Sequence, residues 1–200
     1  PFVALSEKLG LFAGQLTESA IESVEIEYVG EVGELNFAPL TSATVAGLLS
    51  PLLSQVNMVS APAQAKDRGI TVSEVRRASS GAFDSYIRLS VKTERQQRSV
   101  AGTVFSDGKP RVIQVRGINM EAELAPRVLY VTNLDQPGFI GALGSVLGEH
   151  GINIASFNLG REKPGGDAIS LVSIDNEASD AVLEEIMALE QVMQVKQLQF

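Results

Sequence analysis

The sequence contains no cysteine and only one histidine. Without cysteine, the chain can form no disulfide, no thiolate metal site and no cysteine-ligated iron–sulfur cluster, which suits a reducing cytoplasm, where we expect the protein. One histidine cannot by itself build a typical zinc site, so we expect no bound metal. No apolar run approaches the roughly 18 residues needed to cross a bilayer, and no signal peptide opens the chain. We therefore expect no membrane partner.

The usual signatures of catalysis and nucleotide binding are also missing. There is no G-x-G for a dinucleotide fingerprint and no G-x-x-x-x-G-K-[ST] phosphate loop. The lone His150 ends a predicted helix, where the helix dipole favours it, and no nucleophile elbow accompanies it. We expect no catalytic residue and no cofactor bound by this chain, and therefore no active site confined to it.

Acidic residues outnumber basic ones, which gives a net charge of -8 and a pI of about 4.7. A polyanion such as DNA or RNA is therefore not an expected partner. The 200 residues, 44% hydrophobic and 20% charged, are enough for one large or two small soluble domains.

The chain opens directly on a predicted helix, without an initiator methionine and without a preceding loop. Apolar residues recur at 3-4-3-4 spacing over the first 20 residues, at Phe2, Leu5, Leu9, Phe12 and Leu16. We interpret a start inside a helix as the mark of a fragment of a longer protein.

The first 122 residues predict an α+β domain. A strand at 23–30 alternates Val24, Ile26 and Tyr28 with glutamates, and a helix at 41–56 is expected to begin at Thr41 or Ser42 and to kink at Pro51. A short helix ends near Gly69, and β-rich segments follow, two of them joined by a hairpin turn at Asp107-Gly108. Residues 121–126 look like a connector.

Residues 123–200 predict a second domain with the order β-α-β-β-α-β, a ferredoxin-like arrangement. Its first helix, at about 137–149, has Ile140, Leu143, Val146 and Leu147 on its expected core side. Three glycines in this helix each disfavour it by up to ~1 kcal/mol relative to alanine, which suggests close approach to a sheet or to another chain.

The turn before that helix is the strongest candidate site. In a purely structural interpretation, Asp135 caps the helix and Pro137 fixes its first turn. In a functional one, the free amides of the helix attract a carboxylate, Asp135 receives an ammonium group and Asn153 adds an amide. A small α-amino acid carries both charges, and the residues alone favour the two interpretations about equally.

A cationic group lies on the β-rich part of the first domain, at Arg76, Arg77, Lys92, Arg95 and Arg98. Solvated strand faces usually have this composition, and a small-anion site is the less favoured interpretation.

The segment VLYVTNLDQPGFIGALGSVLGEHGINIASFNLGR resembles an ACT domain, the amino-acid-binding module of regulated metabolic enzymes, in its D-x-P-G turn and its GINI segment. The stretches LSEKLGLFAGQL, PLTSATVAGLLSPLLSQVNMVSAPAQAKDRGI and VRGINMEAELAPRVLYVTNLDQPG resemble the C-terminal part of the long-form D-3-phosphoglycerate dehydrogenases. The resemblance covers essentially all 200 residues. It implies an allosteric substrate-binding domain at 1–122 and an ACT domain at 123–200.

The resemblance also implies a function. Members of this family oxidise 3-phosphoglycerate with NAD in serine biosynthesis, and many are inhibited by L-serine bound between two ACT domains of a homo-oligomer. The implied effector contacts are Asn133, Asp135, Gln136, Pro137, Gly138 and Asn153. Arg111 is the implied cation of a possible anion site. NAD would bind the parent enzyme and not this chain, which should be inactive alone.

Two alternatives stay open at this point. The chain is also compatible with the regulatory portion of a bacterial iron–sulfur L-serine dehydratase, although the VNMVSAPAQAKDRGI stretch favours the dehydrogenase. A stand-alone amino-acid sensor that acts by binding a partner is the other alternative.

Overall fold

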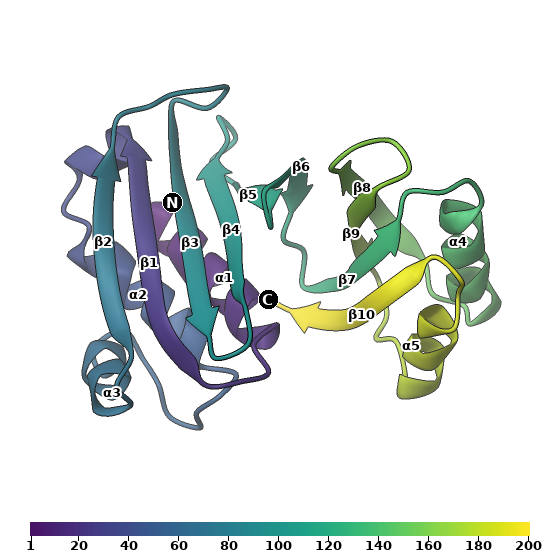
Figure 1. Cartoon of the computed structure of the whole chain (residues 1–200), viewed down its shortest axis with the longest axis horizontal. Coiled ribbons are helices and arrows are strands. Elements are labelled where there is room, and N and C mark those ends of the chain that lie inside the picture. Colours follow the sequence, from purple (N-terminus) through teal and green to yellow (C-terminus); the bar gives the residue numbers. More distant parts are fainter. The chain divides into compact units, whose positions relative to one another are not determined.

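A computed structural model describes all 200 residues, which form two compact units, Pro1–Gly117 and Ile118–Phe200. Each unit has its own helices and strands (Figure 1). The units divide a few residues before the predicted domain boundary at 122/123, which itself stays a prediction. No helix in the structure is both long enough and apolar enough to cross a membrane.

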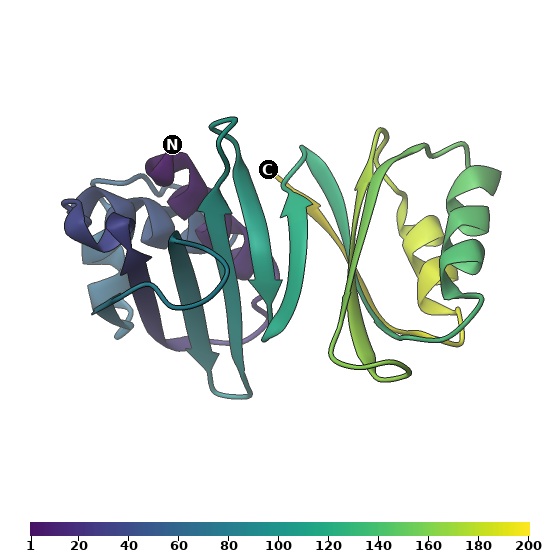
Figure 2. The same cartoon turned by 90° about the horizontal axis from the view of Figure 1, so that it is seen from above.

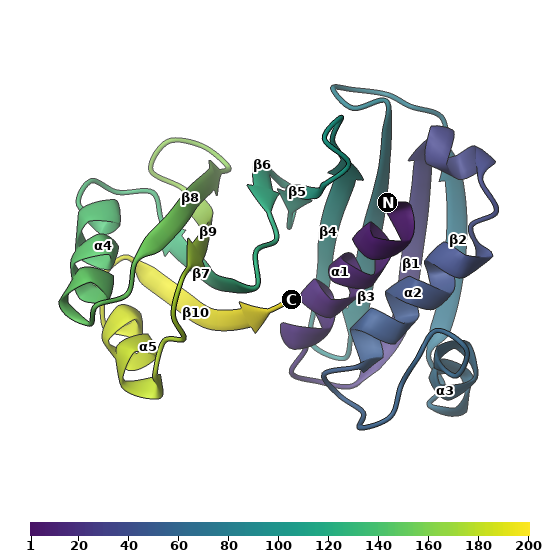
Figure 3. The same ribbon diagram turned by 180° about the vertical axis from the view of Figure 1, so that it is seen from behind.

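The first unit packs three helices on one face of a mixed sheet (Figure 3). Its strands lie in the order β2-β1-β3-β4-β5, in which β1 and β2 are parallel and the other neighbours antiparallel. The elements are α1 (Phe2–Gln15), β1 (Ile21–Gly30), a 3-10 turn η1 (Glu31–Glu34), α2 (Ala38–Leu49), α3 (Ala61–Asp67), β2 (Thr71–Arg77), β3 (Ser85–Thr93), β4 (Gln97–Val104) and β5 (Pro110–Val115).

The alternation read from the sequence places the core of this unit correctly. Val24, Ile26 and Tyr28 of β1 are all buried, and so are Leu5, Leu9, Phe12 and Leu16 of the opening segment. Gly69 adopts the expected left-handed conformation after α3, and Gly108 does so in the predicted hairpin turn. The predicted strand, helix and turn are confirmed.

Helices α1 and α2 pack with their backbones in close contact. A Cβ atom added at Gly10 would lie 2.0 Å from the carbonyl oxygen of Thr44, and one added at Gly47 would lie 2.2 Å from that of Glu7. Only glycine allows this approach, because any larger side chain would force the two helices apart.

The predicted bounds of α2 are wrong at both ends. The helix begins at Ala38 after Phe37, so Thr41 lies inside it and bonds to Glu74 instead of capping the helix. It ends at Leu49 and does not continue through a kink at Pro51, because proline has no N–H to donate and its ring clashes with the preceding turn.

The second unit has the predicted βαββαβ order, and its strands form the antiparallel order β10-β7-β9-β8. It contains β6 (Ile118–Glu123), β7 (Arg127–Leu134), α4 (Phe139–Glu149), β8 (Ile154–Arg161), β9 (Asp167–Ile174), α5 (Asp180–Met187) and β10 (Val192–Gln199). Both helices cover the same face of this sheet (Figure 2). The α+β class and the ferredoxin-like order are thereby confirmed.

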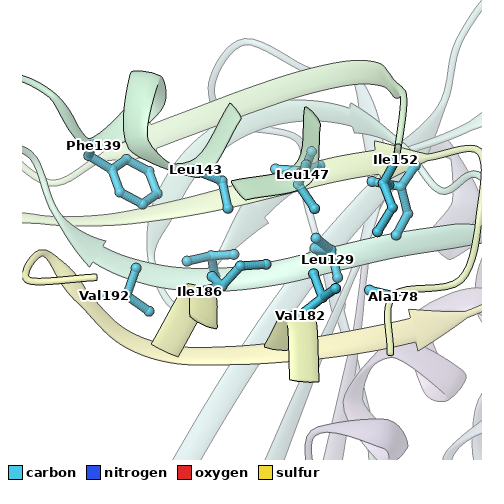
Figure 4. Close-up of a cluster of buried hydrophobic side chains, with 12 residues drawn as sticks. Leu129, Phe139, Leu143, Leu147, Ile152, Ala178, Val182, Ile186 and Val192 are labelled. Atoms are coloured by element: carbon cyan, nitrogen blue, oxygen red, sulfur yellow. The ribbon is translucent and has the colours of Figure 1, made fainter. Parts of the chain in front are cut away.

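The core of this unit lies between the two helices and the sheet (Figure 4). Leu143 and Leu147 of α4 meet Ile186 of α5 over Leu129 of β7, and all four are fully buried. Phe139 takes the core position expected for Ile140, which is 56% exposed instead.

Strand β6 is absent from the sequence prediction, which treated 121–126 as a connector. Met120 and Ala122 alternate with exposed neighbours, so the segment has the period of a strand. It packs closely on Gly160 of β8, where an added Cβ would lie 2.6 Å from the carbonyl oxygen of Asn119.

Candidate functional site at the start of helix α4

The turn between β7 and α4 is held in place by backbone hydrogen bonds. The Leu134 amide donates to the Gln191 carbonyl and the Asp135 amide to the Gly166 carbonyl, both at 2.9 Å. Gly138 has a φ of +92°, a conformation that favours glycine. The D-x-P-G sequence therefore forms a fixed turn whose Gln136, Pro137 and Gly138 are exposed.

Helix α4 starts without a side-chain cap. Its N-cap residue is Gly138, and no side chain accepts a hydrogen bond from the first turn. The interpretation of Asp135 as the cap is wrong, because the helix begins at Phe139, too far along the chain for that carboxylate to reach its amides. The amides of Ile140 and Gly141 have no acceptor within the helix, and with the helix dipole they suit a carboxylate.

Asp135 lies between this turn and the hairpin that joins β8 to β9. Its Oδ2 accepts hydrogen bonds from Nη1 of Arg161 at 2.8 Å and from the Gly165 amide at 3.3 Å. The hydrogen bond from Arg161 is the main cause that lowers the pKa of the Asp135 carboxyl below its usual value, and the Gly165 amide adds to it. Asp135 is therefore a carboxylate at neutral pH.

Asn133 does not face solvent in the single chain. Its side chain is fully buried, where Oδ1 accepts a hydrogen bond from Ser170 at 3.2 Å and Nδ2 donates to the Leu134 carbonyl at 3.0 Å. These bonds satisfy the amide at the base of the turn. Its role as an effector contact stays a prediction.

Asn153 lies at the other end of helix α4 from the turn. It follows the C-terminus of the helix, is exposed and donates to Oδ2 of Asp175 at 2.7 Å. The eleven residues of α4 make the helix roughly 16 Å long. The chain thus brings the residues at 133–138 together and keeps Asn153 apart from them.

The solvent-facing side of α4 carries few protruding side chains, so its surface is smooth. Apart from the backbone of the helix itself, no atom lies within 4 Å of a Cβ added at Gly141, Gly144 or Gly148, and Ile140, which precedes Gly141, is exposed. The close approach predicted from these glycines does not occur within this chain.

Arg161 is the residue at this turn that the sequence analysis missed. The strand order makes β8 parallel to β7, so both strands end at the same edge of the sheet. A polar residue at the end of β8 therefore lies near the turn after β7. This rule could have found Arg161 from the predicted topology alone.

His150 is the C-cap residue of α4, as its place in the sequence suggested. Its Nε2 lies 2.9 Å from Oε1 of Glu185, so it also connects α4 to α5. The structure contains no group of three or more histidine, cysteine, aspartate or glutamate side chains that could hold a metal ion.

Arg111, the possible anion site of the first unit, already has protein partners. Its guanidinium donates to Asp107 at 2.8 Å and lies over the Phe105 ring, 5.1 Å from the centroid. The amide of Lys109, followed by Arg111, lowers the pKa of the Asp107 carboxyl, so the partner is anionic at neutral pH. The Arg111 guanidinium is therefore already engaged by Asp107, and the anion site stays a prediction.

The cationic group expected on the first unit is not gathered into one site. Arg77 pairs with the buried Glu27, and Arg98 donates to the Leu16 carbonyl at 2.8 Å. Lys92 lies 3.7 Å from Glu22, at the opposite end of β1 from Arg77. These local partners favour the interpretation of solvated strand faces.

Comparison with known proteins agrees with the two units. Residues 1–116 match the family model of the D-3-phosphoglycerate dehydrogenase intervening domain, and residues 127–191 match that of the ACT domain. The chain is 30% identical to the D-3-phosphoglycerate dehydrogenase of Bacillus subtilis, over 98% of this chain and 38% of the relative. It is 35% identical to that of Synechocystis, over 93% of this chain and 34% of the relative. The chain thus spans little more than a third of these relatives.

Proposed function

The chain belongs to the D-3-phosphoglycerate dehydrogenase family, and we propose that it acts as a regulatory region that binds L-serine where two ACT domains meet. In this proposal the parent enzyme oxidises 3-phosphoglycerate with NAD, and serine, the end product, inhibits it. The match to dehydrogenases favours this proposal over a serine dehydratase. Because catalysis and NAD binding belong to other residues of the parent, this chain forms no NADH by itself.

The observation that carries the proposal is the separation of the candidate contacts along α4. The turn at 133–138 and Asn153 lie roughly 16 Å apart in one chain, too far to hold one amino acid together. Two copies with antiparallel α4 helices would place the turn of each beside Asn153 of the other. Such a pair has two equivalent composite sites, as a two-fold interface requires.

Two surfaces support a pair of this kind. The smooth outer face of α4, with exposed Ile140 and open glycines, allows a second helix to come close. Strand β8 is an edge strand of its sheet, so its outer backbone groups are available for pairing. We propose that the chain forms homo-oligomers through its ACT domain by these two surfaces.

Regulation then follows from differential binding. Serine changes the activity of the parent enzyme only if it prefers one arrangement of the ACT pair to another. A ligand that contacts both chains has this preference, because its full set of contacts exists only when the two chains meet.

Thermal unfolding tests the proposal. L-serine at about 100 times its dissociation constant should stabilise the chain by ~2.7 kcal/mol and raise Tm by several degrees. Asp135→Ala and Asn153→Ala should each remove the shift, since each completes a composite site. The Lys163→Ala variant, which changes an exposed residue of the β8–β9 hairpin, should keep it.

Alanine and glycine serve as ligand controls. A shift no larger with serine than with these amino acids would show that the serine assignment is wrong. A serine shift that survives Asp135→Ala would leave the ligand in place and overturn the assignment of the site.

A further inference from the structure

The exposed ion pair beside the turn has unused hydrogen-bonding groups on both partners. Arg161 donates to Asp135 through Nη1 alone, and both hydrogen bonds to the Asp135 side chain go to Oδ2. Oδ1 of Asp135, and Nη2 and Nε of Arg161, have no partner in the chain. The side chains are 21% and 52% exposed, respectively, so a ligand can reach both.

The two partners are held together by more than their charges. The Asp135 amide donates to the Gly166 carbonyl, and the Gly165 amide donates to the Asp135 carboxylate, so the β8–β9 hairpin is fastened to the turn. Arg161 is the last residue of β8 and is positioned by the sheet. A free carboxylate oxygen and a free guanidinium edge therefore lie side by side on fixed backbone.

An α-amino acid carries charges that complement this pair. Its ammonium and carboxylate groups are attached to the same carbon atom, so they lie about as close together as the charges of a single ion pair. The ammonium would donate to Oδ1 of Asp135, while the carboxylate would accept from Nη2 or Nε of Arg161. The ion pair does not have to break for either contact to form.

We propose that Arg161 binds the carboxylate of the amino-acid effector and that the Asp135–Arg161 pair selects a zwitterion by contacting both of its charges. This inference rests on the proposed function, and it assigns the acid-recognising group of that site. The hydrogen bond from Arg161 lowers the pKa of the Asp135 carboxyl, so the ammonium group meets a carboxylate at neutral pH.

The test compares three ligands that differ by one charged group. L-serine carries both charges, ethanolamine lacks the carboxylate, and 3-hydroxypropionate lacks the ammonium. Binding to the 200-residue chain is followed by NMR titration of its backbone amides, which measures weak as well as tight binding. The variants are Arg161→Ala, Arg161→Lys and Asp135→Asn, with Lys163→Ala as the matched control that removes an equal charge from the same hairpin.

The proposal predicts which of the three ligands each variant binds more weakly, and not only a loss of serine binding. Arg161→Ala should weaken the binding of L-serine and of 3-hydroxypropionate by about tenfold or more and leave the binding of ethanolamine unchanged. Asp135→Asn should weaken L-serine and ethanolamine and leave 3-hydroxypropionate unchanged. The affinity of Arg161→Lys for L-serine should lie between those of the wild type and Arg161→Ala, because lysine keeps the positive charge but not the planar guanidinium. Lys163→Ala should bind all three ligands as the wild type does.

Two results would overturn this assignment while leaving serine binding intact. If Arg161→Ala weakens serine and ethanolamine by the same factor, Arg161 only holds the turn in shape. If it weakens neither, Arg161 does not contact the ligand. A wild-type chain that binds no serine would instead refute the proposed function itself, and this inference with it.

Discussion

At the scale of single residues, Tyr28 shows how burial couples ionisation to stability. Its ring is fully buried and stacked on Phe37, and its hydroxyl lies 2.6 Å from Oγ1 of Thr41, which in turn donates to Glu74. Burial, together with the negative charge of Glu74, raises the pKa of Tyr28 to about 12, although the hydrogen bond with Thr41 opposes this shift. The folded state therefore favours the neutral phenol.

This shift predicts a loss of stability at alkaline pH. A group whose pKa is raised on folding stabilises the protein fully below its unfolded pKa of about 10, and this contribution disappears as pH rises towards 12. Between about pH 9 and pH 12, wild-type protein should lose about 2–3 kcal/mol more than Tyr28→Phe. Urea denaturation of both proteins across this range measures the difference, and parallel curves would contradict the assignment.

The candidate site also shows which residues a sequence can and cannot place. The D-x-P-G turn was located from its residue types, because proline and a left-handed glycine leave few conformations open. The burial of Asn133 could not be foreseen, since its partner Ser170 is 37 positions away along the chain. Arg161 is different, because the predicted strand order already places the end of β8 at the same edge of the sheet as the turn after β7.

At the scale of elements, the strands and helices whose apolar residues recur with a clear period were predicted from the sequence. The residues at which these elements begin and end were predicted less well. The period of apolar residues fixed β1, α1 and the order of the second unit. The start of α2 could not be placed from the local pattern, because helix ends are the least certain part of such a prediction. Strand β6 does have the period of a strand, but only Met120 and Ala122 are buried within it. Ile140 was assigned to the wrong side of α4, because this helix has apolar residues on more than one side and their spacing does not show which side faces the sheet.

The glycines of α1 and α4 look alike in the sequence and should behave oppositely when changed. Gly144→Ala should stabilise the monomer by up to ~1 kcal/mol, because alanine favours the helix and the site is open. Gly10→Ala should destabilise it by about 1–3 kcal/mol, because the new Cβ would collide with Thr44. Urea denaturation at low protein concentration measures both changes.

The same Gly144→Ala variant tests the outer face of α4. If this face meets a second chain, the added methyl group should weaken self-association in sedimentation experiments while the monomer becomes more stable. Ser145→Ala is a control that adds no volume. Unchanged association in Gly144→Ala would show that α4 is not at the interface.

At the scale of the whole molecule, a site divided between chains makes a prediction about mixtures. Asp135→Asn damages the turn of its own chain, and Asn153→Ala damages the contact that its chain supplies to the other. A mixed pair then has one site with both changes and one with neither. Mixing the two variants under conditions that allow exchange should restore part of the serine-induced thermal shift that each lacks alone. No recovery would indicate a site within a single chain.

The length of helix α4 has a final consequence for control. Because it keeps the two parts of the proposed site apart within each protomer, an isolated protomer offers the amino acid only some of these contacts and should bind it more weakly than a pair does. Dilution of the protein would then weaken its response to serine. Serine would in turn favour association of the chains, since binding and association are linked. The response of such an enzyme to its end product would rise with its own cellular abundance.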